Sequence, residues 1–81
     1  MRIGLRLPKL GATMQEGKIT TWQVKPGDVV QPGDLLCEVE SDKATIDVES
    51  VWAARIAEIV VEAGNTVPVG TTIAFLEKER T

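Results

Sequence analysis

The 81-residue chain contains no histidine, no tyrosine and a single cysteine, Cys37. The missing histidines remove the commonest general base and the commonest zinc ligand. One thiol can form neither an internal disulfide nor a thiolate metal cluster, and a lone cysteine suits a reducing compartment. These absences argue against catalysis by the polypeptide itself and against a metal site.

Long apolar runs and a basic charge balance are lacking as well. No segment approaches the roughly 18–20 apolar residues that span a bilayer, and the first residues form a strand-like pattern rather than a signal peptide. The formal net charge is −3, which disfavours nucleic-acid binding. We expect a cytoplasmic protein, or a mitochondrial matrix protein if the precursor is eukaryotic, that binds neither membrane nor nucleic acid.

The composition suits one small folded domain. The hydrophobic fraction of 43% is ample for a globular core, although a chain of this size buries only about 60–65% of its surface. We therefore expect a single monomeric domain over residues 1–81, with the polar residues 78–81 as the possible start of a linker.

The chain repeats itself with an offset of 37 residues, so that Gly17–Glu40 aligns with Ala54–Glu77 without a gap. Each half carries two glycines six residues apart. In the first half each lies in a Pro-Gly-Asp tripeptide, which is typical of a turn because Pro presets φ and Gly tolerates positive φ. Two copies are too few for a solenoid and predict a compact fold with a pseudo-twofold axis. The glycines are Gly27, Gly33, Gly64 and Gly70.

Short alternating segments between these turns predict an all-β fold. We expect a flattened barrel or sandwich of two small antiparallel sheets. The expected strands are Ile3–Leu7, Ile19–Lys25, a short piece near Val29–Val30, Leu35–Glu40, Ala44–Glu49, Ile56–Val61, a short piece near Thr66–Val67, and Thr72–Glu77.

The two halves differ in one loop. Fourteen positions separate Leu5 from Ile19, whereas ten separate Ile46 from Ile56. The excess falls in residues 8–16, a loop that the symmetric core does not require. Loops of this kind are frequent recognition sites.

Lys43 stands between two expected strands and therefore at or near a hairpin tip. An ordinary solvated turn lysine is the common interpretation. Two observations favour an attachment site instead: the turn joins the two halves of the repeat, and no other cation occurs between Lys25 and Arg55. The carboxylates around it are Glu38, Glu40, Asp42, Asp47 and Glu49.

Several motifs in register resemble the lipoyl domains of 2-oxo acid dehydrogenase complexes, and in particular the type at the N-terminus of dihydrolipoamide acyltransferases. The resemblance covers nearly the whole chain. Its motifs are Leu7–Gly17, the Trp22 strand, the two Pro-Gly-Asp turns, Glu40-Ser41-Asp42-Lys43-Ala44 and Gly64–Gly70. It implies the lipoyl/biotinyl carrier fold and an amide between lipoate and Lys43, with Asp42 and Ala44 as the flanking recognition residues.

The resemblance also implies a function as a swinging-arm carrier of acyl groups and reducing equivalents, without catalytic residues of its own. The implied partners are a thiamine-diphosphate-dependent 2-oxo acid decarboxylase, an acyltransferase core, a dihydrolipoyl dehydrogenase and the lipoate-attachment enzymes. The favoured 2-oxo acid is pyruvate. Partner recognition is implied for the loop residues Leu10, Gly11, Ala12 and Thr13, and for Glu40; an inert connector is the alternative for the loop.

Two other functions stay open. Biotin carriers share the fold but usually have methionine on both sides of the lysine, whereas Asp42 and Ala44 stand here. A lipoyl-like structural module without a modified lysine is the second alternative.

Three further positions carry expectations. Trp22 shares its repeat position with Ile59, which favours core packing, whereas Trp52 has no counterpart and is expected to be partly exposed. Cys37 aligns with Ala74 and reads as a small buried side chain. At Val51–Ala54 the chain lacks the Pro and Gly of many lipoyl domains, so the local turn is not predicted.

Overall fold

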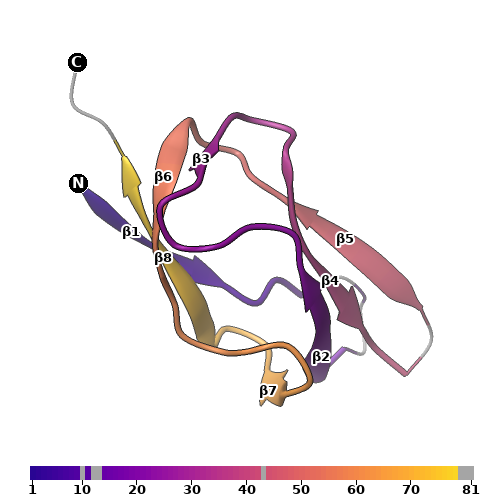
Figure 1. Ribbon diagram of the computed structural model, residues 1–81. Coiled ribbons are helices and arrows are strands. Elements are labelled where there is room, and N and C mark those ends of the chain that lie inside the picture. Colours follow the sequence, from indigo (N-terminus) through magenta and orange to yellow (C-terminus); the bar gives the residue numbers. More distant parts are fainter. Residues whose placement is uncertain (10, 12–13, 43, 79–81) are drawn as a thin grey trace.

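The computed structural model describes residues 1–9, 11, 14–42 and 44–78. The described residues form eight β-strands and no helix. All strand pairs are antiparallel, and they build two four-stranded sheets in the orders β1-β8-β6-β3 and β5-β4-β2-β7 (Figure 1). The prediction of an all-β flattened sandwich is confirmed. The strands are β1 (Arg2–Arg6), β2 (Glu16–Trp22), β3 (Val29–Val30), β4 (Leu35–Glu40), β5 (Thr45–Glu49), β6 (Ala54–Ile59), β7 (Thr66–Pro68) and β8 (Thr72–Lys78).

The pseudo-twofold extends to strand order and to irregularities of pairing. One sheet order reproduces the other when β5, β4, β2 and β7 are matched with β1, β8, β6 and β3. The register shift between Ile19 and Thr21 recurs 37 positions later, between Ile56 and Glu58. The sequence repeat is therefore a repeat of the hydrogen-bonding pattern as well.

The repeated glycines fasten each half to the other. Gly27 and Gly64 have φ angles of 98° and 96°, a left-handed conformation that costs residues with a Cβ about 1–2 kcal/mol. The N–H of Gly27 donates to the carbonyl of Ile56 at 2.8 Å, and that of Gly64 donates to the carbonyl of Ile19 at 2.6 Å. Each turn thus satisfies a carbonyl in the opposite half.

The core lies between the sheets and draws on both halves. Cys37 and its counterpart Ala74 are fully buried, which confirms Cys37 as a small packed side chain. Trp22 is half-buried against this core and its indole N–H donates to the carbonyl of Val61 at 2.8 Å; Trp52 is half-buried, as expected. The buried apolar residues are Leu5, Leu7, Met14, Ile19, Val30, Leu36, Cys37, Val39, Val48, Ala54, Ile56, Ile73, Ala74 and Leu76.

Two strand predictions were placed too far along the chain. The segment expected at Ile19–Lys25 is β2, which begins at Glu16 because residues 16–18 pair with β7. It ends before Lys25, whose N–H donates to the Asp28 carboxylate of the following turn at 3.0 Å. The segment expected at Ile56–Val61 is β6, which begins at Ala54 because that residue pairs with β3. The other strands differ from expectation by no more than one residue at either end.

The β1–β2 loop exceeds the equivalent β5–β6 connection by more residues than the sequence indicated. Leu5 pairs with Ala74, and Val48 pairs with Cys37. Because Cys37 and Ala74 are repeat counterparts, Leu5 matches Val48 and not Ile46. Eight positions separate Val48 from Ile56, so the excess in the β1–β2 loop is six residues rather than four.

The crossover from β5 to β6 replaces proline and glycine with a serine turn. Ser50 is 2% exposed. Its hydroxyl donates to the carbonyl of Trp52 at 2.7 Å and accepts from the N–H of Trp52 at 3.1 Å. A hydroxyl that bonds its own backbone in this way is an established alternative means of closing a turn.

The two ends of the described chain lie side by side. The N-terminal ammonium donates to the carbonyl of Lys78 at 3.0 Å, and the N–H of Lys78 donates to the carbonyl of Met1 at 2.7 Å. The β4–β5 hairpin lies at the opposite end of the molecule (Figure 1). Met1 and Lys78 are therefore neighbours at the end of the molecule away from the hairpin.

Candidate functional site

The β4–β5 hairpin carries the predicted attachment turn. Glu40 and Thr45 are the last paired residues of the two strands. Beyond them the N–H of Ser41 donates to the carbonyl of Ala44 at 2.8 Å. The Ser41 hydroxyl donates to the same carbonyl at 3.1 Å and accepts from the N–H of Ala44 at 3.3 Å. Hydrogen bonds between Ser41 and Ala44 thus tie the two arms of the hairpin together beyond the last paired residues.

The flanking residues Asp42 and Ala44 are exposed at this turn. Lys43 itself lies outside the described residues, so its assignment stays a prediction. Both strands that bracket it form as expected: β4 ends three positions before it in the sequence, and β5 begins two positions after it. The alternation predicted along β5 holds best away from the turn, where Val48 is buried, while Ile46 is only half-buried.

Carboxylates cover the outer face of the sheet beside the turn. Glu38 lies directly across from Asp47 in the β4–β5 ladder, an arrangement of like charges that costs stability. The Thr21 hydroxyl donates to Glu38 at 3.3 Å. Glu38 and Asp47 are therefore brought together on one face. The positions equivalent to Glu38, Asp47 and Glu49 on the other sheet are not acidic, since Phe75, Gly4 and Arg6 occupy them.

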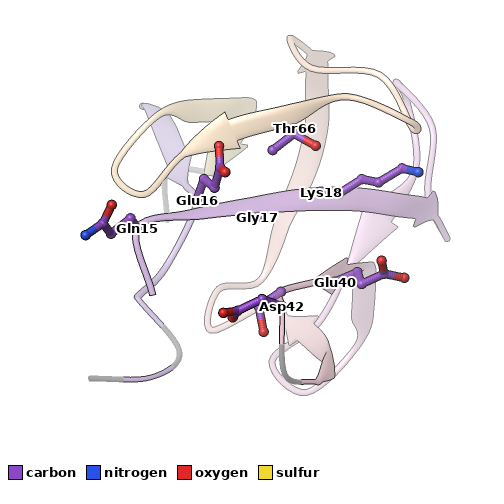
Figure 2. Close-up of a pocket in the computed structure, with 8 residues that line it drawn as sticks. Gln15, Glu16, Gly17, Lys18, Glu40, Asp42 and Thr66 are labelled. Atoms are coloured by element: carbon purple, nitrogen blue, oxygen red, sulfur yellow. The ribbon is translucent and has the colours of Figure 1, made fainter. Parts of the chain in front are cut away.

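A polar groove of about 430 Å³ adjoins the turn. Figure 2 shows β2 along its floor, with Thr66 on one side and with Glu40 and Asp42 on the other. Lys18 of β2 pairs with Glu40 of β4 on one side and with Thr66 of β7 on the other. The groove lining thus includes one lysine and three acidic residues, Glu16, Glu40 and Asp42. Its lining residues are Gln15, Glu16, Gly17, Lys18, Glu40, Ser41, Asp42 and Thr66.

Of the predicted recognition loop, the structure describes Gly11, whereas Leu10, Ala12 and Thr13 lie outside the described residues. Gly11 is exposed, and its carbonyl accepts a hydrogen bond from the N–H of Met14 at 3.2 Å. The C-terminal end of the loop, at Gln15, and the start of β2, at Glu16, line the groove together with Ser41 and Asp42. The loop therefore ends beside the hairpin turn.

Sequence reasoning singled out Glu40 and Asp42 but missed the groove residues Glu16, Lys18 and Thr66. Their meeting depends on the register between β2 and β7. Because β7 is only three residues long, its pattern could not set that register. The 37-residue offset relates the pair Lys18–Thr66 to the pair Val29–Arg55, which the structure also contains. Knowledge of one pair would therefore have predicted the other.

Nucleophilic and metal chemistry find little support among the described residues. They contain no group of three or more His, Cys, Asp or Glu side chains that could hold a metal ion. Burial raises the pKa of the Cys37 thiol to about 12, so the sulfur stays protonated and is a poor nucleophile at neutral pH.

Known proteins place this geometry in a family. A family model described as "Biotin-requiring enzyme" (Biotin_lipoyl) matches residues 4–76. The chain belongs to this biotin/lipoyl family. Membership implies a covalently attached lipoyl or biotin group, and a carrier domain of this family is by itself non-catalytic.

Relatives of this biotin/lipoyl domain include the dihydrolipoyllysine-residue acetyltransferase component of the pyruvate dehydrogenase complex of Rhizobium meliloti, which is 46% identical over 98% of this chain. The corresponding protein of Rickettsia prowazekii is 42% identical over the same share. The chain spans 18% and 20% of the lengths of these two relatives, so it matches one part of each.

Solved structures agree on the fold. The lipoyl domain of the 2-oxoglutarate dehydrogenase complex of Azotobacter vinelandii is 32% identical, with a TM-score of 0.78, and the match covers 94% of this chain and 96% of that one. A multi-domain long-chain acyl-CoA carboxylase matches with a TM-score of 0.80 over 99% of this chain and 7% of its own, at 18% identity. The second likeness shows the shared fold alone.

Among the described residues, no helix is long and apolar enough to span a membrane.

Proposed function

We propose that the chain is a swinging-arm carrier domain whose lipoyl group is attached in amide linkage to Lys43. The observation that carries the proposal is the position of the Asp42-Lys43-Ala44 sequence. It falls in the tied turn of the β4–β5 hairpin, at the end of the molecule opposite Met1 and Lys78. The fold in which this turn stands matches a solved lipoyl domain.

The described residues fit a covalently attached group. Asp42 and Ala44 are exposed, so an attaching enzyme can reach the turn from both sides. The backbone on both sides of Lys43 is fixed by the hydrogen bonds between Ser41 and Ala44 and by the ladder below them. When bound, a lipoyl group supplies a disulfide ring that can take up an acyl group and electrons together.

The protein contributes position rather than chemistry. A carrier tethered near several active sites raises the local concentration of its group at each of them. Amide formation removes one positive charge and takes the formal net charge from −3 to −4. The acidic outer face around Glu38 and Asp47 then lacks its nearest cation in sequence.

The proposed setting is a pyruvate dehydrogenase complex, as in the relatives from Rhizobium meliloti and Rickettsia prowazekii. The proposed partners are the thiamine-diphosphate-dependent decarboxylase, the acyltransferase core, dihydrolipoyl dehydrogenase and the lipoate-attachment enzymes. In this proposal residues 1–81 form one monomeric cytoplasmic carrier domain of a dihydrolipoamide acyltransferase, with residues 78–81 at the start of a linker.

Intact mass tests the attachment. The chain is treated with a lipoate ligase, lipoate and ATP, in parallel with Lys43→Ala. Lys25→Ala is the matched control, because Lys25 is an exposed lysine next to another tight turn. We expect one lipoyl increment in the wild-type chain and in Lys25→Ala, and none in Lys43→Ala. An increment that survives in Lys43→Ala would overturn the assignment.

The same assay separates the alternatives. Treatment with a biotin ligase and biotin should leave the mass unchanged; a biotin increment at Lys43 would instead make the chain a biotin carrier. Failure of both ligases would indicate an unmodified structural module.

A further inference from the structure

The β1–β2 loop buries the side chain of Met14, whereas the equivalent β5–β6 crossover exposes the side chain at the matching position. Met14 and Val51 are counterparts under the 37-residue offset. Met14 is 8% exposed, whereas Val51 is 70% exposed. The six extra residues of the first loop therefore end in an apolar contact with the core that the second half lacks.

The space for Met14 exists because position 17 is a glycine. A Cβ at Gly17 would lie 2.9 Å from Cε of Met14 and 2.7 Å from Cγ1 of Val39, closer than packed carbons approach. The counterpart of Gly17 is Ala54, which does carry a Cβ and is buried. The exchange of alanine for glycine thus leaves room for the methionine, a side chain well suited to irregular gaps.

The space left at Gly17 also adjoins the strand that leads into the hairpin turn, because Val39 lies beside it together with Met14. Val39 is fully buried in β4, directly before Glu40. On the other side of Met14, Gln15 is held by the N–H of Val69, which donates to its carbonyl at 2.9 Å. The methionine side chain therefore fixes the loop end at the place where Gln15 and Glu16 face Ser41 and Asp42 across the groove.

We propose that Met14, seated against Gly17 and Val39, is a positioning residue that sets the groove beside the hairpin turn into the shape read by the decarboxylase. The proposal rests on the carrier function proposed above. Met14 does not touch the partner; it holds Gln15 and Glu16 where they line the groove beside the turn. The attachment enzymes need the hairpin alone, whose turn is closed by its own hydrogen bonds.

Kinetics of the lipoylated domain as substrate test the proposal. Met14→Ala removes the side chain, and Val51→Ala is the matched control at the equivalent exposed position. With the decarboxylase and pyruvate, we expect the KM for Met14→Ala to rise about tenfold while kcat changes by less than about twofold. Val51→Ala should behave as the wild type, and all three should be lipoylated at the same rate.

Two further variants keep the test independent of simple unfolding. Met14→Leu retains most of the apolar volume and should restore the wild-type KM. Gly17→Ala disturbs the same contact by adding a methyl and should raise the KM, whereas Ala54→Gly, its counterpart, should not. Circular dichroism establishes that each variant is folded. Amide hydrogen exchange should be faster at Gln15 and Glu16 in Met14→Ala, and unchanged at Glu40 and Thr45.

The outcomes are distinct. If the wild-type domain is not acylated by the decarboxylase, the carrier function itself is wrong and the positioning role falls with it. If the wild type is acylated and Met14→Ala has the same KM, only the positioning role is overturned. A loss of lipoylation and of amide protection throughout Met14→Ala, without rescue by Met14→Leu, would also overturn it, because Met14 would then be an ordinary core residue.

Discussion

At the hairpin turn, the residue that fixes the backbone conformation differs from the residues proposed to be recognised by the modifying enzyme. Ser41 closes the backbone through its hydroxyl and its N–H. Asp42 and Ala44 are exposed, and Ala44 takes part in that closure only through its backbone N–H and carbonyl. Their side chains can therefore specify which enzyme acts on the lysine proposed as the attachment site.

Replacing Asp42 and Ala44 together by methionine should therefore change the attached group while the fold is kept. We expect the double variant Asp42→Met/Ala44→Met to gain a biotin increment with a biotin ligase, measured by intact mass. Single variants are the controls. No gain of biotin would mean that the position of the turn, and not its flanking residues, selects the cofactor.

Because of Cys37, the free energy of unfolding should fall at alkaline pH. The pKa of Cys37 is raised by burial from 9.0 to about 12. Between these values the unfolded chain loses a proton that the folded chain keeps, so the free energy of unfolding falls as the pH rises. The slope for one proton is at most about 1.4 kcal/mol per pH unit.

The variant Cys37→Ala should lack this contribution, and the counterpart Ala74 shows that an alanine can occupy the equivalent core position. Urea denaturation of both proteins below and above pH 9.0 measures the effect. We expect the wild type to lose stability relative to Cys37→Ala as the pH rises through this window. Parallel pH curves would contradict the burial of the thiol.

At the scale of elements, two serines perform the same task in different surroundings. Ser50 and Ser41 each donate a hydroxyl hydrogen bond to a carbonyl, and each accepts one from the N–H of the same residue. Ser50 is 2% exposed, whereas Ser41 lies at a half-exposed turn. Water can replace the bonds of the second serine far more readily than those of the first.

Ser50→Ala should consequently destabilise the domain by about 1–2 kcal/mol, because it leaves buried backbone groups without a partner. Ser41→Ala should cost about 0.5 kcal/mol or less. The measurement is the urea midpoint at constant m-value. Equal losses would show that burial does not decide the strength of these turns.

The elements also show what a sequence pattern can and cannot predict. The sequence located β4 without error because turn signals bound it at both ends, at Pro32-Gly33-Asp34 and at the hairpin. For β2 and β6 the predicted bounds were displaced, since their first residues are placed by pairing with β7 and β3, which local sequence does not show. The hairpin residues Asp42 and Ala44 were predicted from local sequence. The groove residues Lys18 and Thr66 were not, because only strand register brings them together.

At the scale of the whole molecule, the pseudo-twofold relates the hairpin turn to the place where Met1 and Lys78 meet. Under the pseudo-twofold, β4 and β5 correspond to β8 and β1. Glu40 pairs with Thr45 before the turn, and Glu77 pairs with Arg2 at the equivalent place. The sequence repeat predicted that Lys43 lies at the junction of the two halves. It could not show that Met1 and Lys78 lie at the equivalent place, because the residues of β1 have no counterpart at an offset of 37 residues.

A circular permutant tests this equivalence. Glu77 is joined to Arg2 through a copy of residues 41–44, and new ends are opened between Pro8 and Lys9, in the loop that exceeds its counterpart. We expect a lipoate ligase to attach two groups, one at Lys43 and one at the copied lysine, as counted by intact mass. The control carries arginine at the copied lysine and should take one group.

A permutant that folds but takes only one group would assign recognition to more than the turn. The obvious source is the face around the original hairpin, where Glu38 and Asp47 stand in place of Phe75 and Gly4.

The opposite placement of the turn and the chain ends also has a mechanical consequence. Any tether that continues from Lys78 holds the domain at one end of a body whose longest extent is 40 Å. The hairpin turn with the proposed attachment site lies at the opposite end of that body. In the proposed carrier function, the folded domain would therefore add to the reach of the flexible side chain and enlarge the radius over which the attached group is delivered.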